Sequence, residues 1–223
     1  MDSQRHVKSK RAKASAKTDI TGKECTAHNK KQKHSQNRGP YTWVLSSHVS
    51  HFTPKRIALL ALLTALGCIG RWLFAVPFLP NIQPMTTILL LVTLHFGVVD
   101  GIIVSILSIL LTNMLLGMGP WTLHQIGTYM IVMALTGILR PLYARQTPLH
   151  FMLLTLYAGL VGLLYGFIIS IFSVYMYQMP SFLAYYMRGI PFDMLHGLGN
   201  IGFFSLLVPI LRPILEKKFP STP

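Results

Sequence analysis

From Pro54 onward the chain is a succession of long apolar runs with very few charges, and this pattern permits few folds. The first run, Arg56–Val76, reads RIALLALLTALGCIGRWLFAV, and the run Leu149–Tyr177 has no Asp, Glu, Lys or Arg. A helix needs about 20 apolar residues to cross the hydrocarbon core of a bilayer. Because backbone N–H and C=O groups find no water there, they must bond within the protein. The runs therefore predict an all-α membrane protein.

Six such runs can be delimited by charges, glycines and prolines. They are Arg56–Val76, Pro84–Val99, Gly101–Leu116, Trp121–Leu139, Leu149–Tyr177 and Pro191–Leu211. The second and third are short, and an ionised Asp at the middle of a bilayer is costly. We therefore expect Asp100-Gly101 between them to form a tight turn at the membrane surface.

The positive charges predict the orientation of these six helices. With the N-terminus inside the cell, only Arg71 and Arg188 fall outside. The basic residues on the cytoplasmic side are then Lys55, Arg56, Arg140, Arg145, Arg212, Lys217 and Lys218. Cytoplasmic loops of membrane proteins carry an excess of Lys and Arg. We therefore expect six transmembrane helices with both termini inside (N-in/C-in), in a multi-pass protein of the plasma membrane.

The first 50 residues differ sharply from the rest of the chain. They contain 11 Lys or Arg against three Asp or Glu, and almost no large apolar side chains. Such a segment cannot bury enough surface to offset its ordering entropy. We expect a disordered basic cytoplasmic tail (1–50) that lies against anionic lipid, then a six-helix domain (51–218) and a C-terminal tail (219–223). Nucleic-acid binding is the alternative for the basic run, but we expect no nucleic-acid partner.

The two cysteines, Cys25 and Cys68, predict no disulfide framework, because one lies in the tail and one in an apolar run. Cys25 and the scattered histidines near it are too few for a closed metal site. We therefore expect neither a bound metal nor a cofactor.

Polar and aromatic residues gather at the predicted outer ends of the helices. One example is the stretch GMGPWTLHQ at Gly117–Gln125, between the third and fourth runs. Polar groups on membrane helices normally face protein or water rather than lipid. We therefore expect a substrate pocket open to the outside, formed by Arg71, Trp72, Asn81, Gln83, Asn113, Trp121, Gln125, Tyr177, Arg188, Asp193, His196 and Asn200.

Each of these residues also has an ordinary structural explanation. Asp193, His196 and Asn200 share one helix face, at spacing i, i+3, i+7. His196 and Asn200 could bond to other helices, and Asp193 in a first turn could complement the helix dipole. Asp193 could equally pair with Arg71 or Arg188, and Arg71 could reach lipid phosphate.

No enzymatic motif is present, and nothing in the chain supplies energy for transport. The sequence lacks paired carboxylates at a suitable depth, H-E-x-x-H, G-x-S-x-G and a P-loop. An outward pocket without an energy source indicates a substrate-capturing subunit that is not itself an enzyme. The first run adds Ala58, Ala61 and Ala65, and the last two form a small-x-x-x-small stripe that lets another helix approach closely.

The region from Pro54 to Lys218 resembles the S components, the substrate-capture subunits of energy-coupling factor transporters. The resemblance lies in Ala61-x-x-x-Ala65 and in the segments RWLFAVPFLPNIQPMTTILLL, TNMLLGMGPWTLHQ and RGIPFDMLHGLGN. It implies a six-helix vitamin-binding protein of the bacterial plasma membrane. It also implies that the alanine motif contacts a transmembrane coupling protein carried on two ATP-binding-cassette ATPases. The S component binds its vitamin from outside and then topples in the membrane to release it inside.

Two segments, GMGPWT-x-x-Q and PFD-x-x-H-x-x-x-N, are most similar to the cobalamin-type S components. Cobalamin has many amides and few charges, which suits a pocket of mostly neutral hydrogen-bonding groups. Riboflavin, folate or a pyridoxine-like vitamin could use the same aromatic residues. The alternative outside this family is an independent secondary membrane carrier.

Overall fold

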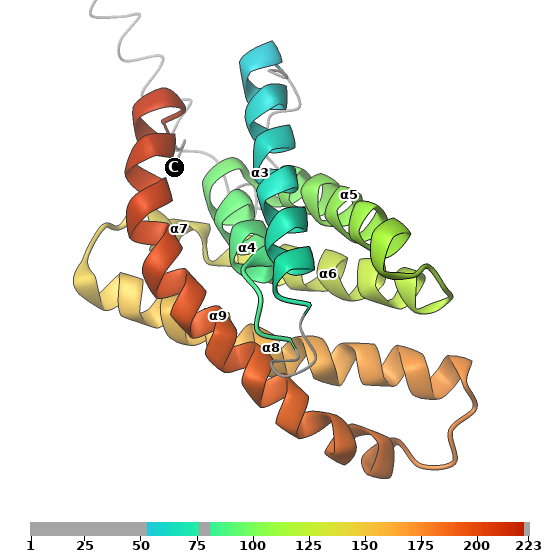
Figure 1. The fold of residues 1–223 in the computed structure, drawn as a ribbon. Coiled ribbons are helices and arrows are strands. Elements are labelled where there is room, and N and C mark those ends of the chain that lie inside the picture. The colour runs from blue at the N-terminus through green and yellow to red at the C-terminus, as the bar shows by residue number, and fades with distance from the viewer. Residues whose placement is uncertain (1–52, 76–80, 221–223) are drawn as a thin grey trace, which may run out of the picture. The chain divides into compact units, whose positions relative to one another are not determined.

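A computed structural model describes residues 53–75 and 81–220 (Figure 1). These residues form seven helices and no strand, so the all-α class is confirmed for this part of the chain. The basic tail 1–50 lies outside the described residues. The helices are α3 (Pro54–Leu73), α4 (Met85–Phe96), α5 (Val98–Leu116), α6 (Trp121–Ile138), α7 (Arg140–Ala144), α8 (Pro148–Met176) and α9 (Phe182–Lys218).

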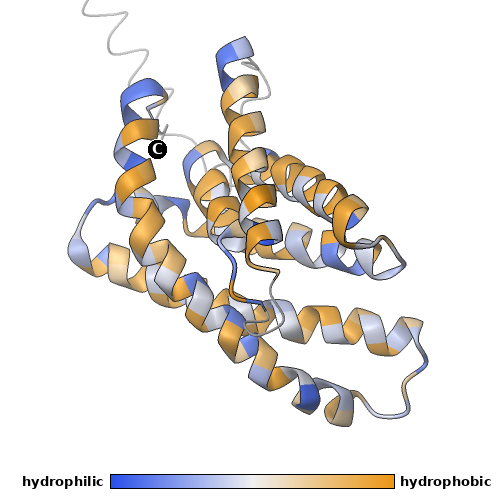
Figure 2. Ribbon diagram, viewed as in Figure 1, coloured by the Kyte–Doolittle hydropathy of each residue, from blue (hydrophilic) through white to orange (hydrophobic). Residues whose placement is uncertain are grey.

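Four of the described helices are long and apolar enough to cross a membrane. They are α3, α5, α8 and α9, and Figure 2 shows hydrophobic residues along each of them. Helix α4 is apolar but has only 12 residues, and the 18-residue helix α6 does not belong to this set. The chain is thus a membrane protein with at least four candidate spans, while the count of six remains a prediction.

Helix α4 is the central helix of the bundle. All 12 of its residues are buried, and α3, α5, α6, α7 and α9 pack around it. A helix that is hydrophobic on every side belongs in an interior. Helix α4 can be short because protein rather than lipid surrounds it.

The predicted turn at Asp100-Gly101 is wrong. The chain turns at Gly97 instead, where φ is 123°, a value that favours glycine. Asp100 lies buried in the first turn of α5 and forms an ion pair with Arg56 of α3. The sequence argument assumed that an ionised Asp must face water, whereas a partner on another helix allows it to be buried.

The last helix begins well before its predicted start at Pro191. Helix α9 runs for 37 residues from Phe182, and Pro191 lies inside it. Ser181 caps its start by accepting a hydrogen bond from the Ala184 N–H, at 3.3 Å. Asp193 is therefore three turns into the helix, which removes the helix-dipole explanation for that residue.

Helices α8 and α9 form the most extensive helix pair, and glycines allow them to approach closely. A Cβ on Gly197 would lie 2.7 Å from the Gly159 carbonyl oxygen. A Cβ on Gly162 would lie 2.5 Å from the Gly197 Cα. Small residues at a helix interface give this kind of backbone contact in membrane proteins.

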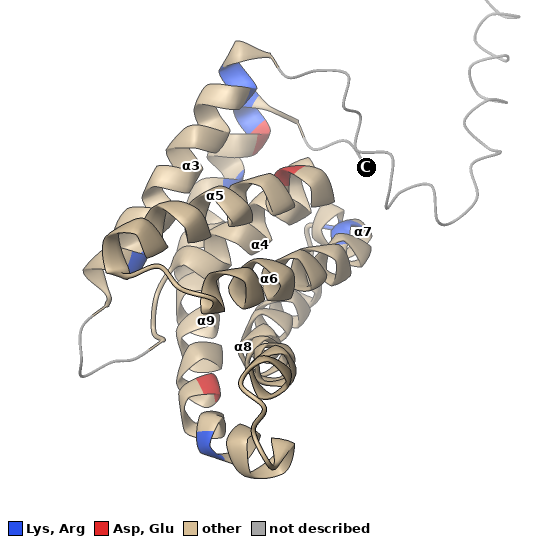
Figure 3. Ribbon diagram, turned by 90° about the vertical axis from the view of Figure 1, so that its right-hand side faces the viewer, with Lys and Arg blue, Asp and Glu red and all other residues tan. Residues whose placement is uncertain are grey.

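One end of the bundle, here called the basic end, joins the start of α3, the α4–α5 junction, α7 and the end of α9. Arg212 of α9 donates to the Tyr143 carbonyl at 2.7 Å, and its guanidinium lies 4.1 Å from the Tyr143 ring centre. His95 of α4 bonds the Phe219 carbonyl at 2.8 Å. Figure 3 shows charged residues on these segments. Burial raises the pKa of the Tyr143 hydroxyl, with a smaller opposing effect from Arg212, so this group stays protonated.

Candidate substrate-binding site

The other end of the bundle contains the end of α3, the α5–α6 connection and the α8–α9 connection. This follows from chain direction, because α3, α5 and α8 run away from the basic end while α4, α6 and α9 run toward it (Figure 1). Most of the predicted pocket residues belong to segments at this end. The polar contacts begin here and continue into the interior.

The α5–α6 connection is held by side-chain hydrogen bonds. Asn113, buried near the end of α5, donates to Thr122 Oγ1 at 2.9 Å and to Gln125 Oε1 at 2.8 Å. Gly117, with φ at 117°, provides the turn between the two helices. The structure thus brings Asn113 and Gln125 together, whereas Trp121 remains 44% exposed beside them.

Arg71 turns into the protein rather than toward lipid. Its Nη1 donates to Thr112 Oγ1 of α5 at 2.8 Å. The two ion pairs of the described residues lie at the basic end, so neither Arg71 nor Arg188 pairs with Asp193. Of the alternatives left open for Asp193, an ion pair with Arg71 or Arg188 is therefore absent from this part of the chain.

Deeper in the bundle lies a group that we call the buried polar cluster: Thr86, Tyr129, Tyr165, Asp193, His196 and Asn200. Thr86 Oγ1 lies 2.8 Å from the Tyr129 hydroxyl and 3.0 Å from His196 Nε2. The Tyr165 ring lies 4.9 Å from the Tyr129 ring and 5.3 Å from the His196 ring, between centroids. Four helices thus contribute to one polar and aromatic layer.

Several buried atoms in and beside this cluster have no hydrogen-bond partner among the described residues. On α9 these are Asp193 Oδ2 and both side-chain atoms of Asn200. On α6 they are Thr128 Oγ1 and His124 Nδ1. A buried polar group without a partner costs roughly 1–3 kcal/mol. Unpaired groups in the interior are expected where a ligand supplies the missing partners.

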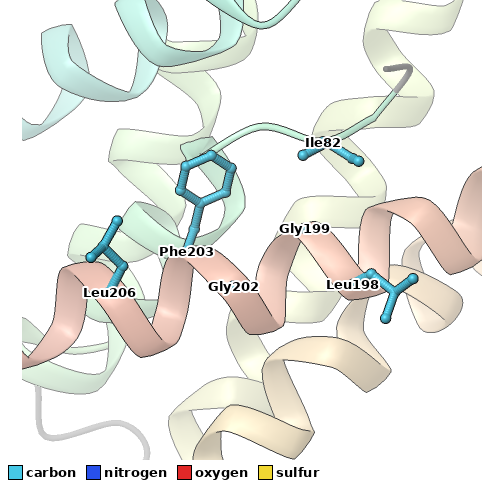
Figure 4. Close-up of a pocket in the computed structure, with 6 residues that line it drawn as sticks. All are labelled: Ile82, Leu198, Gly199, Gly202, Phe203 and Leu206. Carbon is cyan, nitrogen blue, oxygen red and sulfur yellow. The ribbon is translucent and has the colours of Figure 1, made fainter. Parts of the chain in front are cut away.

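A hollow of about 340 Å³ lies on the other side of α9 (Figure 4). Its lining is Ile82, Leu198, Gly199, Gly202, Phe203 and Leu206. Asn81 and Gln83 were predicted to line the pocket, but Ile82 between them lines this hollow instead. Asn81 is exposed with φ at 65°, and Gln83 is half-buried.

Four other predicted pocket residues lie at the surface: Trp72, Trp121, Tyr177 and Arg188. Their exposed surfaces are open to lipid or to a ligand at the mouth of a site. Tyr129 and Tyr165 were not predicted as site residues, although each places a hydroxyl within a largely apolar run. Gly166, whose absent side chain leaves the space that the Asp193 carboxylate occupies, was not predicted either.

The described residues contain no group of three or more His, Cys, Asp or Glu side chains placed to hold a metal ion. The candidate site instead offers neutral donors and acceptors, aromatic faces, one carboxylate and one guanidinium. Such a set suits an organic ligand with many hydrogen-bonding groups.

Comparison with protein families decides what kind of protein carries this site. The family described as ECF transporter, substrate-specific component, matches residues 55–211, from α3 through most of α9. The chain belongs to this family. It is therefore a substrate-specific subunit of a membrane transporter. A search of curated proteins found no match.

In this S component, the three alanines that were predicted to meet a partner lie on an open face. Ala58, Ala61 and Ala65 are all exposed on α3. Leu62 and Leu66 beside them are exposed too, at 65% and 42%. The small residues therefore form a shallow strip between larger apolar side chains, which a second helix can approach.

Proposed function

We propose that this S component binds a vitamin from outside the cell at the buried polar cluster, with cobalamin or a corrinoid precursor as the first candidate. The observation that carries the proposal is a set of buried atoms on α6 and α9 that have no hydrogen-bond partner in the described part of the chain. A transporter subunit must desolvate its substrate, and these atoms are placed to replace the lost water. Most of them belong to neutral groups, which suits a ligand rich in amides.

The shape of the ligand separates the candidates. The hollow of about 340 Å³ lies on another side of α9 from the buried polar cluster, so its volume does not measure the proposed site. A flat vitamin such as riboflavin, folate or a pyridoxine-like compound is the second candidate, favoured by the grouped rings of Tyr129, Tyr165 and His196.

We also propose six spans with both termini inside. Helices α4 and α6 complete the count, with α4 enclosed by protein. The basic start of α3 and the basic end of α9 meet at one end of the bundle, through α7 and the α4–α5 junction. A shared basic end supports a cytoplasmic location for both.

The ligand proposal is tested by purifying the full chain in detergent and recording an absorption spectrum, because corrinoids and flavins absorb differently in the visible range. Titration calorimetry with cyanocobalamin, riboflavin, folate and pyridoxine then gives the affinities. We expect one of these four vitamins to bind. Capture of none would contradict the proposal, and uptake that needs no ATP would support an independent carrier.

For coupling, we propose that Ala58, Ala61 and Ala65 contact a transmembrane coupling protein that two ATP-binding-cassette ATPases drive. Replacing Ala61 and Ala65 together by Trp fills the strip. We expect uptake in cells to fall at least tenfold while ligand binding by the purified chain is unchanged. Leu135→Trp, at a 40% exposed position on α6, is the matched control. Normal uptake by the double variant would remove this interface.

A further inference from the structure

Asp193 and Asn200 stand two turns apart on one face of α9, with His196 between them. Seven residues of helix span about 10 Å. His196 Nε2 lies 3.0 Å from Thr86 Oγ1, whereas the two outer side chains hold atoms that have no partner within residues 53–75 and 81–220. The three residues therefore differ in what they still require from a ligand.

Asp193 requires a donor. The residue is only 7% exposed, its Oδ2 has no partner among the described residues, and no ion pair reaches it there. Its carboxylate occupies the space that a side chain on Gly166 would fill. Arg71, the cation at this end of α3, is already bonded to Thr112. A carboxylate in this position repels an anionic ligand group and accepts from N–H or O–H.

Asn200 requires both a donor and an acceptor. It is fully buried, and neither Nδ2 nor Oδ1 has a partner among the described residues. A ligand edge with a donor beside an acceptor satisfies both atoms at once, as a primary amide, a lactam edge of a ring, or an amino group beside a ring nitrogen does. An isolated hydroxyl or ring nitrogen satisfies one atom and leaves the other unpaired.

We infer that Asp193 and Asn200 determine ligand specificity, by selecting a compound with an N–H or O–H donor at one point and an edge with adjacent donor and acceptor groups, such as an amide, about 10 Å away. The inference rests on the proposed function and names the chemistry of the same site. Under this inference, compounds that present carboxylates to Asp193 and Asn200 do not bind. Corrinoid side-chain amides and the dione ring of a flavin both carry the required edge.

The test measures binding of cyanocobalamin, riboflavin, folate and pyridoxine to the purified full chain and its variants in detergent. Asn200→Leu removes the amide at similar size, and Gly166→Ala displaces the Asp193 carboxylate without changing its chemistry. For the ligand that wild type binds, we expect each variant to lower the affinity by about 10- to 100-fold. Met194→Ala, at a 56% exposed position on the same helix, should bind as wild type does.

Two further measurements separate specificity from a merely structural role. Without ligand, Asn200→Leu should unfold at the wild-type temperature or above, because it removes an unsatisfied buried group. If cyanocobalamin is the ligand, a derivative with its side-chain amides hydrolysed to acids should bind at least tenfold more weakly to wild type.

The outcomes distinguish this inference from the proposed function. Wild-type affinity in both Asn200→Leu and Gly166→Ala, or equal binding of the acid derivative, would overturn the inference and leave vitamin binding intact. If Asn200→Leu fails to fold, Gly166→Ala alone decides. Failure of wild type to bind any of the four candidate vitamins would overturn both.

Discussion

Gly162 on α8 sets how closely the two longest helices approach, so Gly162→Ala should loosen this pair. The new Cβ would lie 2.5 Å from the Gly197 Cα and 2.9 Å from the carbonyl carbon of His196. Ordinary contact begins at 3.4 Å, so the helices must separate by about an ångström. The opposing atoms are backbone, and no side-chain rotation relieves the overlap.

Overpacking of this kind costs about 1–3 kcal/mol. We expect the upper part of that range, which corresponds to a roughly 100-fold lower ratio of folded to unfolded protein. Movement of the His196 backbone should also break its 3.0 Å bond with Thr86 and weaken ligand binding. The effect on binding should therefore accompany the effect on stability.

Titration with SDS in mixed micelles measures the folding free energy of the full chain and the variant. Gly202→Ala is the matched control, because a Cβ there meets nothing within 4 Å. We expect the control to be as stable as wild type or more so, since Ala favours a helix over Gly. If both variants showed the same stability, the argument from close α8–α9 packing would be refuted.

Two predictions concern the basic end. Arg56→Leu leaves the 3% exposed Asp100 without its partner, which should cost about 3–5 kcal/mol in the same titration. Combining it with Asp100→Leu should recover most of that loss, and a single variant as stable as the double would contradict the pairing. Arg212→Ala removes the contacts to Tyr143, so amide hydrogens of residues 211–218 should exchange several-fold faster. Exposed Lys217→Ala is its control, and equal exchange in both would show that Arg212 does not hold the end of α9.

Much of the helix arrangement could be predicted, because apolar runs and turn residues are local signals. The starts of α6 at Trp121 and of α8 at Pro148 fall within a residue of expectation. The wrong predictions concern residues whose positions depend on partners far away in the sequence. Asp100 was assigned to a surface turn because Arg56, 44 residues earlier, was not counted as its partner.

The candidate site likewise combines residues that local spacing predicts with residues that it does not predict. Helical spacing correctly placed Asp193, His196 and Asn200 on one face, and all three are buried. The hydroxyls of Thr86 and Tyr129, which complete the contacts of His196, come from two other helices and carry no local signal. No property of Ile82 in the sequence indicates that it lines a hollow with α9.

The sequence by itself determined that this chain is helical, membrane-embedded and similar to S components, because hydropathy and short motifs are properties of consecutive residues. Only the tertiary structure decided that α4 is enclosed and that Asp100 is paired. It also decided that Asp193 and Asn200 are buried with side-chain atoms that have no partner among the described residues. The reason is physical: whether a polar atom is satisfied depends on what lies within about 3 Å of it in space, and those atoms come from other helices.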